Sequence, residues 1–500
     1  MKSKSSNPTK SVYSKQSIEI RTVFEKASSP RKVLCVALDY AKKKHVALFC
    51  DGLGDILKKP FTVENNAEGI EFLCKEIKST SSRRKIKKDS IFLGGEDEPA
   101  YVANFVATLT RKGYLVVRVN AREAAKQREN MLASTDNLDL LGISKCLLNR
   151  RACPVSSANK QNSVYRELLE ISRQRRNYVR QQTAASNRIH AIADQLFPGF
   201  LNHSLSGITP FKKASLALMK DRFSTTQFAR RKQKSLANTL RLHRVRNAEE
   251  KAYTLIELAK HALPPDPDRI NSLQQSIIGL IDLFECLQNN AEILRHEAAT
   301  LLATTPYIML TSISGISFVL ASGIAAELGD PAYLPPTASL CAYAGIVPAV
   351  MQTGGPDSAA IHLSTRARCN HILKDWIVQG SQKIGLCGPL ELKSKYIKRS
   401  ANGQHAAYAG ARTLLRITRN LVTNETPYLP PNARYHGASS GEIAEGCLET
   451  WGKLVEKWRV IPGWQHMLSD ENHPMGFWRR VVTELHDVEL PLRSMAPRRQ

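Results

Sequence analysis

Residues 33–39 read VLCVALD, an apolar run that ends on a carboxylate. A second apolar run, SIFLGGE at residues 90–96, ends in the same way. The segment STDNLDLLGISKCLL, residues 134–148, is typical of a helix whose first turn carries two carboxylates on one face. Carboxylates at strand ends and on a neighbouring helix supply the oxygen ligands that hard cations prefer. The pattern therefore predicts a divalent-metal site formed by Asp39, Glu96, Asp136 and Asp139.

The charge of the chain points to a polyanionic partner. Its 500 residues hold 71 Lys and Arg against 45 Asp and Glu, a formal net charge of +26. The basic clusters are spread over 81–88, 173–176, 229–234 and 241–246 rather than confined to one tail. A charge of this sign and size favours nucleic acid. Together with a carboxylate metal site, it indicates metal-assisted cutting or joining of a phosphodiester backbone.

Composition disfavours two other classes of protein. No apolar stretch approaches the roughly 20 residues that a membrane-spanning helix needs, so we expect no membrane partner. The 10 Cys include no Cys-x-x-Cys pair, which argues against a cysteine-ligated zinc site. Reduced thiols in a cytoplasmic protein are the simplest interpretation of these cysteines.

An α/β pattern extends from residue 33 to 120. Three successive strands form a predicted meander, and two helices then alternate with two further strands. This order fits a mixed sheet of the ribonuclease-H-like type, with carboxylates at the ends of its first and fourth strands. The predicted strands are 33–40, 45–50, 57–63, 90–95 and 114–120, and the predicted helices are 65–78 and 99–113.

The rest of the chain is predicted to be mainly helical. Residues 161–200 and 210–305 have helical periodicity without compact globular patterning, which favours a coiled-coil or helical-hairpin arm. Residues 312–330 place a Gly turn between two helical segments, as in a helix-hairpin-helix element whose turn amides hold a phosphate. Four of the five Trp lie in the last 50 residues, where we expect a small aromatic core.

One face of the first long helix is rich in Arg. We expect this face to bind nucleic acid, although a merely solvated face fits the pattern equally well. Its candidate contacts are Arg173, Arg175, Arg176 and Arg180.

Several motifs occur in the order found in the insertion sequence 110 family of transposases, DEDD recombinases guided by a bridge RNA. VALDYAKKKHVALF resembles the family's opening Asp-x-x-Lys segment, and GGEDEPAYVANF is similar to its Glu-Pro-Thr-Gly segment, although Asp97 and Glu98 precede Pro99. STDNLDLLGISKCLL resembles the Thr-Asp-x-x-Asp-Ala segment, with Leu140 in place of Ala. YRELLEISRQRRNYVRQQ is similar to the connecting helix, and LTSISGISFVLASGIAAELGD to the C-terminal transposase domain. The resemblance covers residues 33–422.

The resemblance implies an active site divided between subunits of a dimer or tetramer. The ribonuclease-H-like (RuvC-type) domain would hold Mg²⁺ (or Mn²⁺). The C-terminal domain would supply the side-chain hydroxyl that attacks DNA, and a structured guide RNA would select the DNA sites. A bacterial cytoplasmic, nucleoid-associated protein is implied. The expected segments are a disordered basic tail (1–30), the catalytic domain (31–155), a helical coiled-coil arm (156–305), the transposase domain (306–424) and a Trp-containing extension (425–500).

The nucleophile departs from the family pattern. The family's serine precedes Gly in the loop after Ala-Gly-Leu-x-Pro, and the matching position in AGIVPAVMQTGG is Thr353, with Ser358 and Ser364 as alternatives. Arg366 and Arg368 are expected to clamp a phosphate. Two other functions stay open: a metal-dependent nuclease or junction resolvase that uses only water, and a non-catalytic nucleic-acid-binding relic.

Overall fold

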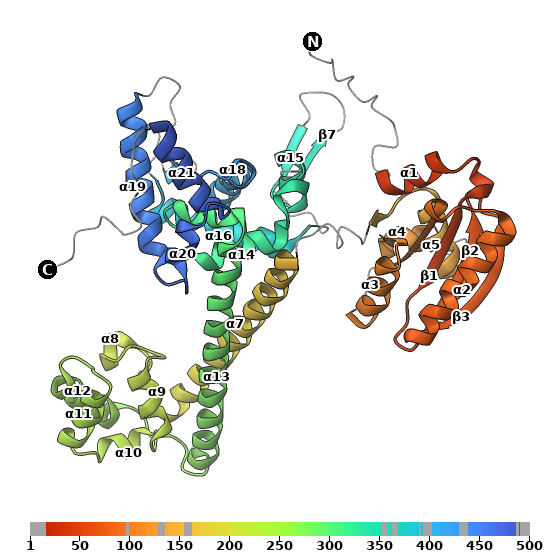
Figure 1. Ribbon diagram of the computed structural model, residues 1–500. Coiled ribbons are helices and arrows are strands. Elements are labelled where there is room, and N and C mark those ends of the chain that lie inside the picture. Colours follow the sequence, from red (N-terminus) through yellow and green to blue (C-terminus); the bar gives the residue numbers. More distant parts are fainter. Residues whose placement is uncertain are drawn as a thin grey trace. The chain divides into compact units, whose positions relative to one another are not determined.

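The chain divides into two compact units, residues 1–162 and 163–500 (Figure 1). The computed structural model describes residues 17–96, 100–127, 136–154, 163–347, 349–352, 359–362, 369–389, 392–393, 403–429, 439–486 and 490. Within these residues no helix is both long and apolar enough to cross a membrane.

A mixed six-stranded sheet forms the centre of the first unit, in the order β3-β2-β1-β4-β5-β6. The first three strands form the predicted antiparallel meander, and β4 and β5 run parallel to β1. This mixed sheet confirms the predicted ribonuclease-H-like fold. The strands are β1 (Leu34–Asp39), β2 (Lys44–Asp51), β3 (Ile56–Glu64), β4 (Ile91–Glu96), β5 (Leu115–Val119) and β6 (Cys153–Pro154).

Helices cover both faces of this sheet, because its strands are apolar on both sides. One core, the α2-side core, lies beneath α2 (Ala67–Arg84) and α3 (Ala103–Arg111). The other, the α5-side core, lies beneath α1 (Ile18–Lys26), α4 (Ala121–Lys126) and α5 (Asp136–Leu148). Short 3₁₀ helices connect these elements at Pro30–Lys32, Lys88–Ser90 and Ala100–Val102.

The prediction of a disordered tail is wrong for residues 18–26, which form α1. Ser17 caps this helix by accepting a hydrogen bond from the Ile20 amide, and Ile20 and Val23 are buried in the α5-side core. Two apolar side chains one turn apart are enough to dock a short helix, although the surrounding segment is rich in Lys and Ser.

Two helices of 34 residues each, α7 (Ser163–Leu196) and α13 (Ile270–Ala303), form the arm. They pack along each other (Figure 1). The start of α7 and the end of α13 share the core of the C-terminal region, whereas their other ends share a second core. The two helices therefore run antiparallel, as a helical hairpin.

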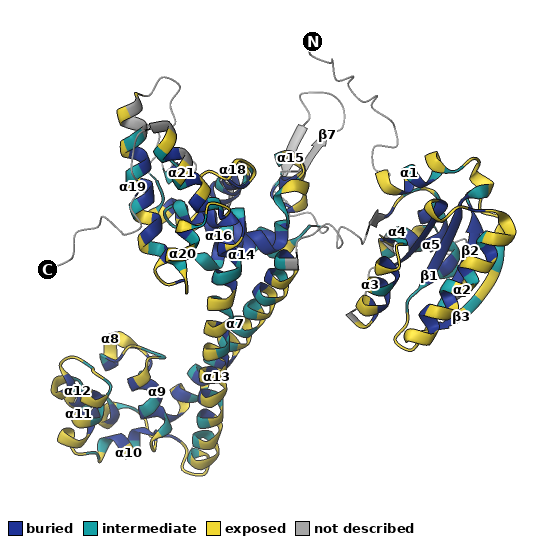
Figure 2. Ribbon diagram, in the orientation of Figure 1, coloured by how far each residue is buried: buried dark blue, intermediate teal, exposed yellow. Residues whose placement is uncertain are grey.

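Between α7 and α13 in the sequence, the chain forms a compact lobe of short helices at one end of the arm. The sequence pattern did not predict this lobe. Four Phe rings at its centre, from Phe197, Phe200, Phe223 and Phe228, have centroids 4.8–6.1 Å apart. The lobe's buried residues belong to one shared core, and Figure 2 marks them on its helices. The lobe comprises α8 (His203–Ser206), α9 (Lys213–Lys220), α10 (Thr225–Ala229), α11 (Gln233–Leu242) and α12 (Ala248–His261).

The C-terminal region is one helical body with a single continuous core, which includes the expected extension. Trp451 and Trp458 are fully buried in that core, so the expected aromatic cluster is shared with residues 306–424 rather than separate. Its elements are η4 (Pro306–Ser312), α14 (Phe318–Leu328), η5 (Pro331–Tyr333), α15 (Thr337–Tyr343), β7 (Ala349–Gln352), β8 (Ala359–His362), α16 (His371–Cys387), α18 (Gly403–Asn424), α19 (Ser440–Trp458), α20 (Trp464–Ser469) and α21 (Pro474–His486).

The expected helix-hairpin-helix element has a 3₁₀ helix, η4, as its first segment. Gly315 has a φ of +94° and forms the turn before α14. A Cβ at this position would lie 3.0 Å from the carbonyl oxygen of Lys383 on α16, so the turn packs closely against that helix.

Candidate active site

Asp39 and Glu96 lie at the same edge of the sheet. Parallel strands β1 and β4 pair Leu38 with Gly95, so the two carboxylates end neighbouring strands. Side chains alternate across a strand, and Ala37 on β1 and Phe92 on β4 lie in the α5-side core. Asp39 is two positions beyond Ala37, and Glu96 is four positions beyond Phe92, so each carboxylate points to the same face as its reference residue. Both partly buried carboxylates therefore face the α5 side.

The glycine pair before Glu96 allows two close approaches to β4. A Cβ at Gly94 would lie 2.5 Å from Leu147 Cδ2, which belongs to α5. A Cβ at Gly95 would lie 2.4 Å from Tyr40 Cε2. Because the two positions point to opposite faces, Gly94 admits α5 and Gly95 admits the Tyr40 ring. The sequence Gly-Gly-Glu thus brings α5 directly beside the carboxylate edge.

Asp139 lies in the first turn of α5, and α5 packs on β1 and β4. Asp139 is partly buried, and its Oδ1 atom is shielded from solvent. Burial, followed by the nearby carboxylates of Glu123 and Glu96, raises the pKa of Cys146 on the same helix to about 11. Glu96 is therefore close enough to α5 to act on it electrostatically. Asp136 begins α5, but its side chain lies outside the described residues.

The residues at this edge suit a hard divalent cation by type and by face. Carboxylate oxygens are the preferred ligands of Mg²⁺, and Asp39, Glu96 and Asp139 all belong to the α5 side of the sheet. Among the side chains that the structure describes, however, no three His, Cys, Asp or Glu are gathered closely enough to hold a metal ion. Convergence of the four carboxylates on one cation therefore stays a prediction.

Glu123 is a further carboxylate in this region, and the sequence reasoning missed it. It lies on α4, which follows β5, the parallel neighbour of β4. Its Oε2 atom is 3.6 Å from Nη1 of Arg151, and like Glu96 it acts on Cys146. The signal in the sequence was its position just after the end of a predicted strand, the same rule that identified Asp39 and Glu96.

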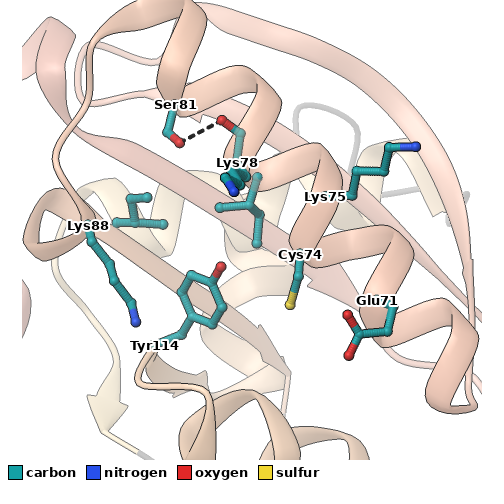
Figure 3. A pocket seen from close by; sticks show the side chains of 9 residues that line it. Glu71, Cys74, Lys75, Lys78, Ser81, Lys88 and Tyr114 are labelled. Carbon is teal, nitrogen blue, oxygen red and sulfur yellow. Dashed lines mark hydrogen bonds between the residues drawn. The ribbon is translucent and has the colours of Figure 1, made fainter.

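A hollow of about 490 Å³ lies at the opposite edge of the sheet. It is lined by α2 and by Ile91 and Tyr114, which stand at the starting ends of β4 and β5. Figure 3 shows the Tyr114 ring between the side chains of Lys88 and Cys74. Burial raises the pKa of the Cys74 thiol, so this thiol is protonated and a poor nucleophile. The hollow is thus separate from the carboxylate edge.

Two short strands that the sequence analysis did not predict flank the expected nucleophile in the sequence. Strands β7 and β8 are antiparallel, with Gln352 paired to Ala359, and residues 353–358 connect them. Thr353 is the first residue of that connection and lies outside the described residues, as do Arg366 and Arg368.

A buried polar network supports the base of the segment that carries this hairpin. The Glu327 carboxylate on α14, whose side chain is 2% exposed, accepts two hydrogen bonds from Arg173 on α7, at 2.9 and 3.0 Å. It also accepts one from Asn370 Nδ2, at 2.7 Å. Asn370 caps α16 and donates to the Tyr343 hydroxyl at 2.9 Å. Residues 343 and 370 precede and follow the segment that contains β7 and β8, so this network joins two points of the chain on either side of that segment.

The structure gives the Arg candidates on α7 different surroundings. Arg173 pairs with Glu327, and Arg176 pairs with Asp375 on α16. Arg175 is partly buried, and burial lowers the pKa of its guanidinium. Arg180 is exposed and, among the described residues, forms no ion pair. Arg180 is therefore the α7 candidate whose side chain is open to a phosphate, while Arg173 and Arg176 connect the arm to the C-terminal helices.

Two family models match the chain. A DEDD transposase model of the IS110 group matches residues 36–198, and a model described as the IS116/IS110/IS902 family of transposases matches residues 308–385. The chain belongs to the IS110 family of transposases. No curated protein is similar enough to match it.

Membership of this family identifies a DNA-binding enzyme that performs phosphoryl transfer on DNA. The first matched range contains all four carboxylate candidates, and the second contains Thr353. Most of the lobe and residues beyond 385 lie outside both ranges.

Proposed function

We propose that this transposase cuts and rejoins DNA at a divided active site. The observation that carries the proposal is the placement of Asp39 and Glu96 at the ends of neighbouring parallel strands, facing the helix that begins at Asp136. A divalent cation held there would neutralise charge on the phosphoryl oxygens of the scissile group. The proposed ligands of Mg²⁺ or Mn²⁺ are Asp39, Glu96, Asp136 and Asp139.

The Thr353 hydroxyl is the proposed nucleophile. Its Oγ1 forms a bond to phosphorus while the bond from phosphorus to the departing strand oxygen breaks. The hydroxyl proton leaves Thr353, and the departing oxygen takes up a proton, so the step needs no other reactant. Attack by a strand-end hydroxyl on the Thr353 phosphodiester reverses these changes and rejoins DNA. Arg366 and Arg368 would stabilise the charge that develops on the phosphoryl oxygens.

An oligomer and a structured guide RNA complete the proposal. The carboxylates belong to the unit 1–162 and Thr353 to the unit 163–500. Each unit would supply one part of the proposed site, and in the proposed dimer or tetramer the two parts come from different subunits. The proposal predicts mixed-subunit rescue. An Asp39→Asn protein and a Thr353→Ala protein, each inactive alone, should recover activity when co-expressed with the RNA encoded beside the gene. Recovery that does not require that RNA would exclude guidance by it.

The carboxylate site is tested by Asp39→Asn and Glu96→Gln. Each should reduce Mg²⁺-dependent DNA processing by more than the roughly 10–100-fold that loss of outer-shell support costs a metal site, with DNA affinity and thermal stability kept. Asp89→Asn is the matched control. Asp89 is exposed and precedes the other end of β4. Equal activity in Asp39→Asn and Asp89→Asn proteins would exclude the proposed site.

The nucleophile is tested by trapping a protein–DNA adduct and identifying the modified peptide by mass spectrometry. An adduct on Thr353 that is lost in Thr353→Ala and kept in Thr353→Ser supports the assignment. Modification of Ser358 or Ser364 would move the role to that residue. Metal-dependent cleavage without any adduct would instead favour a nuclease or junction resolvase that activates water.

A further inference from the structure

The lobe carries a concave basic surface, here named the lobe pocket. Its volume is about 600 Å³, and it lies outside both the carboxylate edge and the hairpin. The ends of α8 and α11 and the starts of α9 and α12 surround it. The cations in its lining are Lys212, Lys213, Arg244, Arg246 and Lys251.

In the described part of the chain, the cations of the lobe pocket have no carboxylate partners. Five of its lining side chains are Lys or Arg, and none is Asp or Glu. Among the described residues, these five form no ion pair. Lys220, another cation of the lobe, is paired by contrast: its Nζ atom lies 2.8 Å from Asp282 and 2.7 Å from Glu285. Like charges gathered without counter-charges repel one another, and a bound polyanion removes that repulsion.

Ordered backbone builds the lobe pocket. The turn between α11 and α12 places Arg244 in the left-handed region, with a φ of 55°, and is held by a hydrogen bond from the Val245 amide to the Leu240 carbonyl, at 3.0 Å. On the opposite wall, a Cβ at Gly207 would touch the Lys251 side chain, 3.4 Å from its Cγ. Lys213 begins α9, so the positive end of that helix dipole adds to the field.

We propose that the lobe pocket binds backbone phosphates of duplex DNA. The inference rests on DNA as the substrate but does not depend on Thr353 as the nucleophile. His243 is the only ring in its lining, whereas sites for single-stranded nucleic acid usually stack bases on several aromatic side chains. Cations without stacking platforms match a duplex backbone, which presents phosphates and keeps its bases paired.

The position of the lobe indicates what such a contact would do. At 1.5 Å per residue, an arm helix is about 50 Å long, and the lobe and the C-terminal core lie at its two ends. At about 3.4 Å per base pair, this length corresponds to roughly 15 base pairs. The lobe pocket would therefore hold DNA that flanks the site of chemistry, keeping a cut end attached.

The test compares two triple variants of the full-length protein. The pocket variant carries Lys212→Gln, Lys213→Gln and Arg246→Gln, because these side chains are exposed. Arg244 is kept because its backbone is left-handed. The control variant removes the same charge from exposed cations of the lobe outside the pocket, with Arg230→Gln, Lys232→Gln and Lys234→Gln.

Binding to duplex DNA of arbitrary sequence is measured at several salt concentrations, without divalent cations and in an Asp39→Asn background. Loss of chemistry then cannot affect the result, so failure of the proposed active site is distinguishable from failure of the lobe pocket. Each lost phosphate contact lowers the slope of log affinity against log salt by about 0.9. We expect the pocket variant to lose about 2.7 from that slope and the control variant to keep it.

Three outcomes would overturn the proposal. The first is unchanged DNA affinity and salt slope in the pocket variant. The second is an equal loss of DNA affinity in both variants, which would indicate diffuse charge. The third is a loss of affinity only for a structured RNA of equal charge. Circular dichroism and thermal unfolding, performed on both variants, establish that each is folded. If the pocket variant is unfolded, the single variant Lys212→Gln should still lower the salt slope by about 0.9. An unchanged slope in the Lys212→Gln protein contradicts the proposal.

Discussion

Replacing Arg173 with Ala should destabilise the unit 163–500. The change leaves the Glu327 carboxylate, 2% exposed, with the 2.7 Å hydrogen bond from Asn370 but without its two hydrogen bonds from Arg173. Breaking a buried ion pair by removing one partner costs about 3–5 kcal/mol. The Arg173 side chain is 49% exposed, so water reaches the vacated space and solvent screens the pair. We therefore expect the lower end, about 3 kcal/mol.

Thermal unfolding followed by circular dichroism measures this effect. At about 2 °C per kcal/mol for a large unit, Arg173→Ala should lower the midpoint by about 6 °C. Arg180→Ala is the matched control, because Arg180 is an exposed residue of the same helix, and its change should stay within about 0.5 kcal/mol. Arg173→Lys keeps the charge but loses the two-pronged geometry, and should fall between them.

The reasoning fails if Arg173→Ala unfolds at the wild-type temperature. A loss of DNA affinity equal to that of Arg180→Ala, with stability unchanged, would then make Arg173 a nucleic-acid contact. Because Asn370 shares Glu327 and flanks the hairpin, the variant should also lose DNA processing beyond what its folded fraction explains.

Two further changes test packing and burial. Gly94→Ala should lower the free energy of unfolding, measured with denaturant, by about 1–3 kcal/mol, because the new Cβ meets Leu147. The control is Gly279→Ala on the exposed face of α13, where the new Cβ meets nothing within 4 Å and should stabilise the protein by up to about 1 kcal/mol. Equal effects of the two changes would contradict the close approach of α5. Burial lowers the pKa of Lys457 to about 8 from 10.5, so between pH 8 and 10.5 the unfolded chain binds more protons than the folded one. The unfolding free energy of the wild type should therefore rise with pH by about 1.4 kcal/mol per pH unit relative to that of Lys457→Met. A difference in unfolding free energy that stays constant over this pH range would refute the shift.

Local sequence patterns determined most of the first unit. Apolar runs bounded by polar residues located the five long strands, and helical periodicity located α2, α3 and α5, because one or both faces of each element are buried. The position of a carboxylate at the end of such a run was enough to place Asp39 and Glu96 at one edge. The β-hairpin after residue 348 escaped notice, since its strands have only four residues each.

The identity of each carboxylate and Arg was readable in the sequence, but its partner was not. Glu327 and Arg173 are 154 residues apart and meet only because α7 packs on α14. The same holds for the lobe, where several short helices enclose a shared Phe core that forms only when they pack together. Sequence alone therefore established the five long strands of the first unit, the long helices and the basic charge. Tertiary packing decided which cations are bound to carboxylates and which remain open to a phosphate, because ion pairing depends on distance in space rather than along the chain.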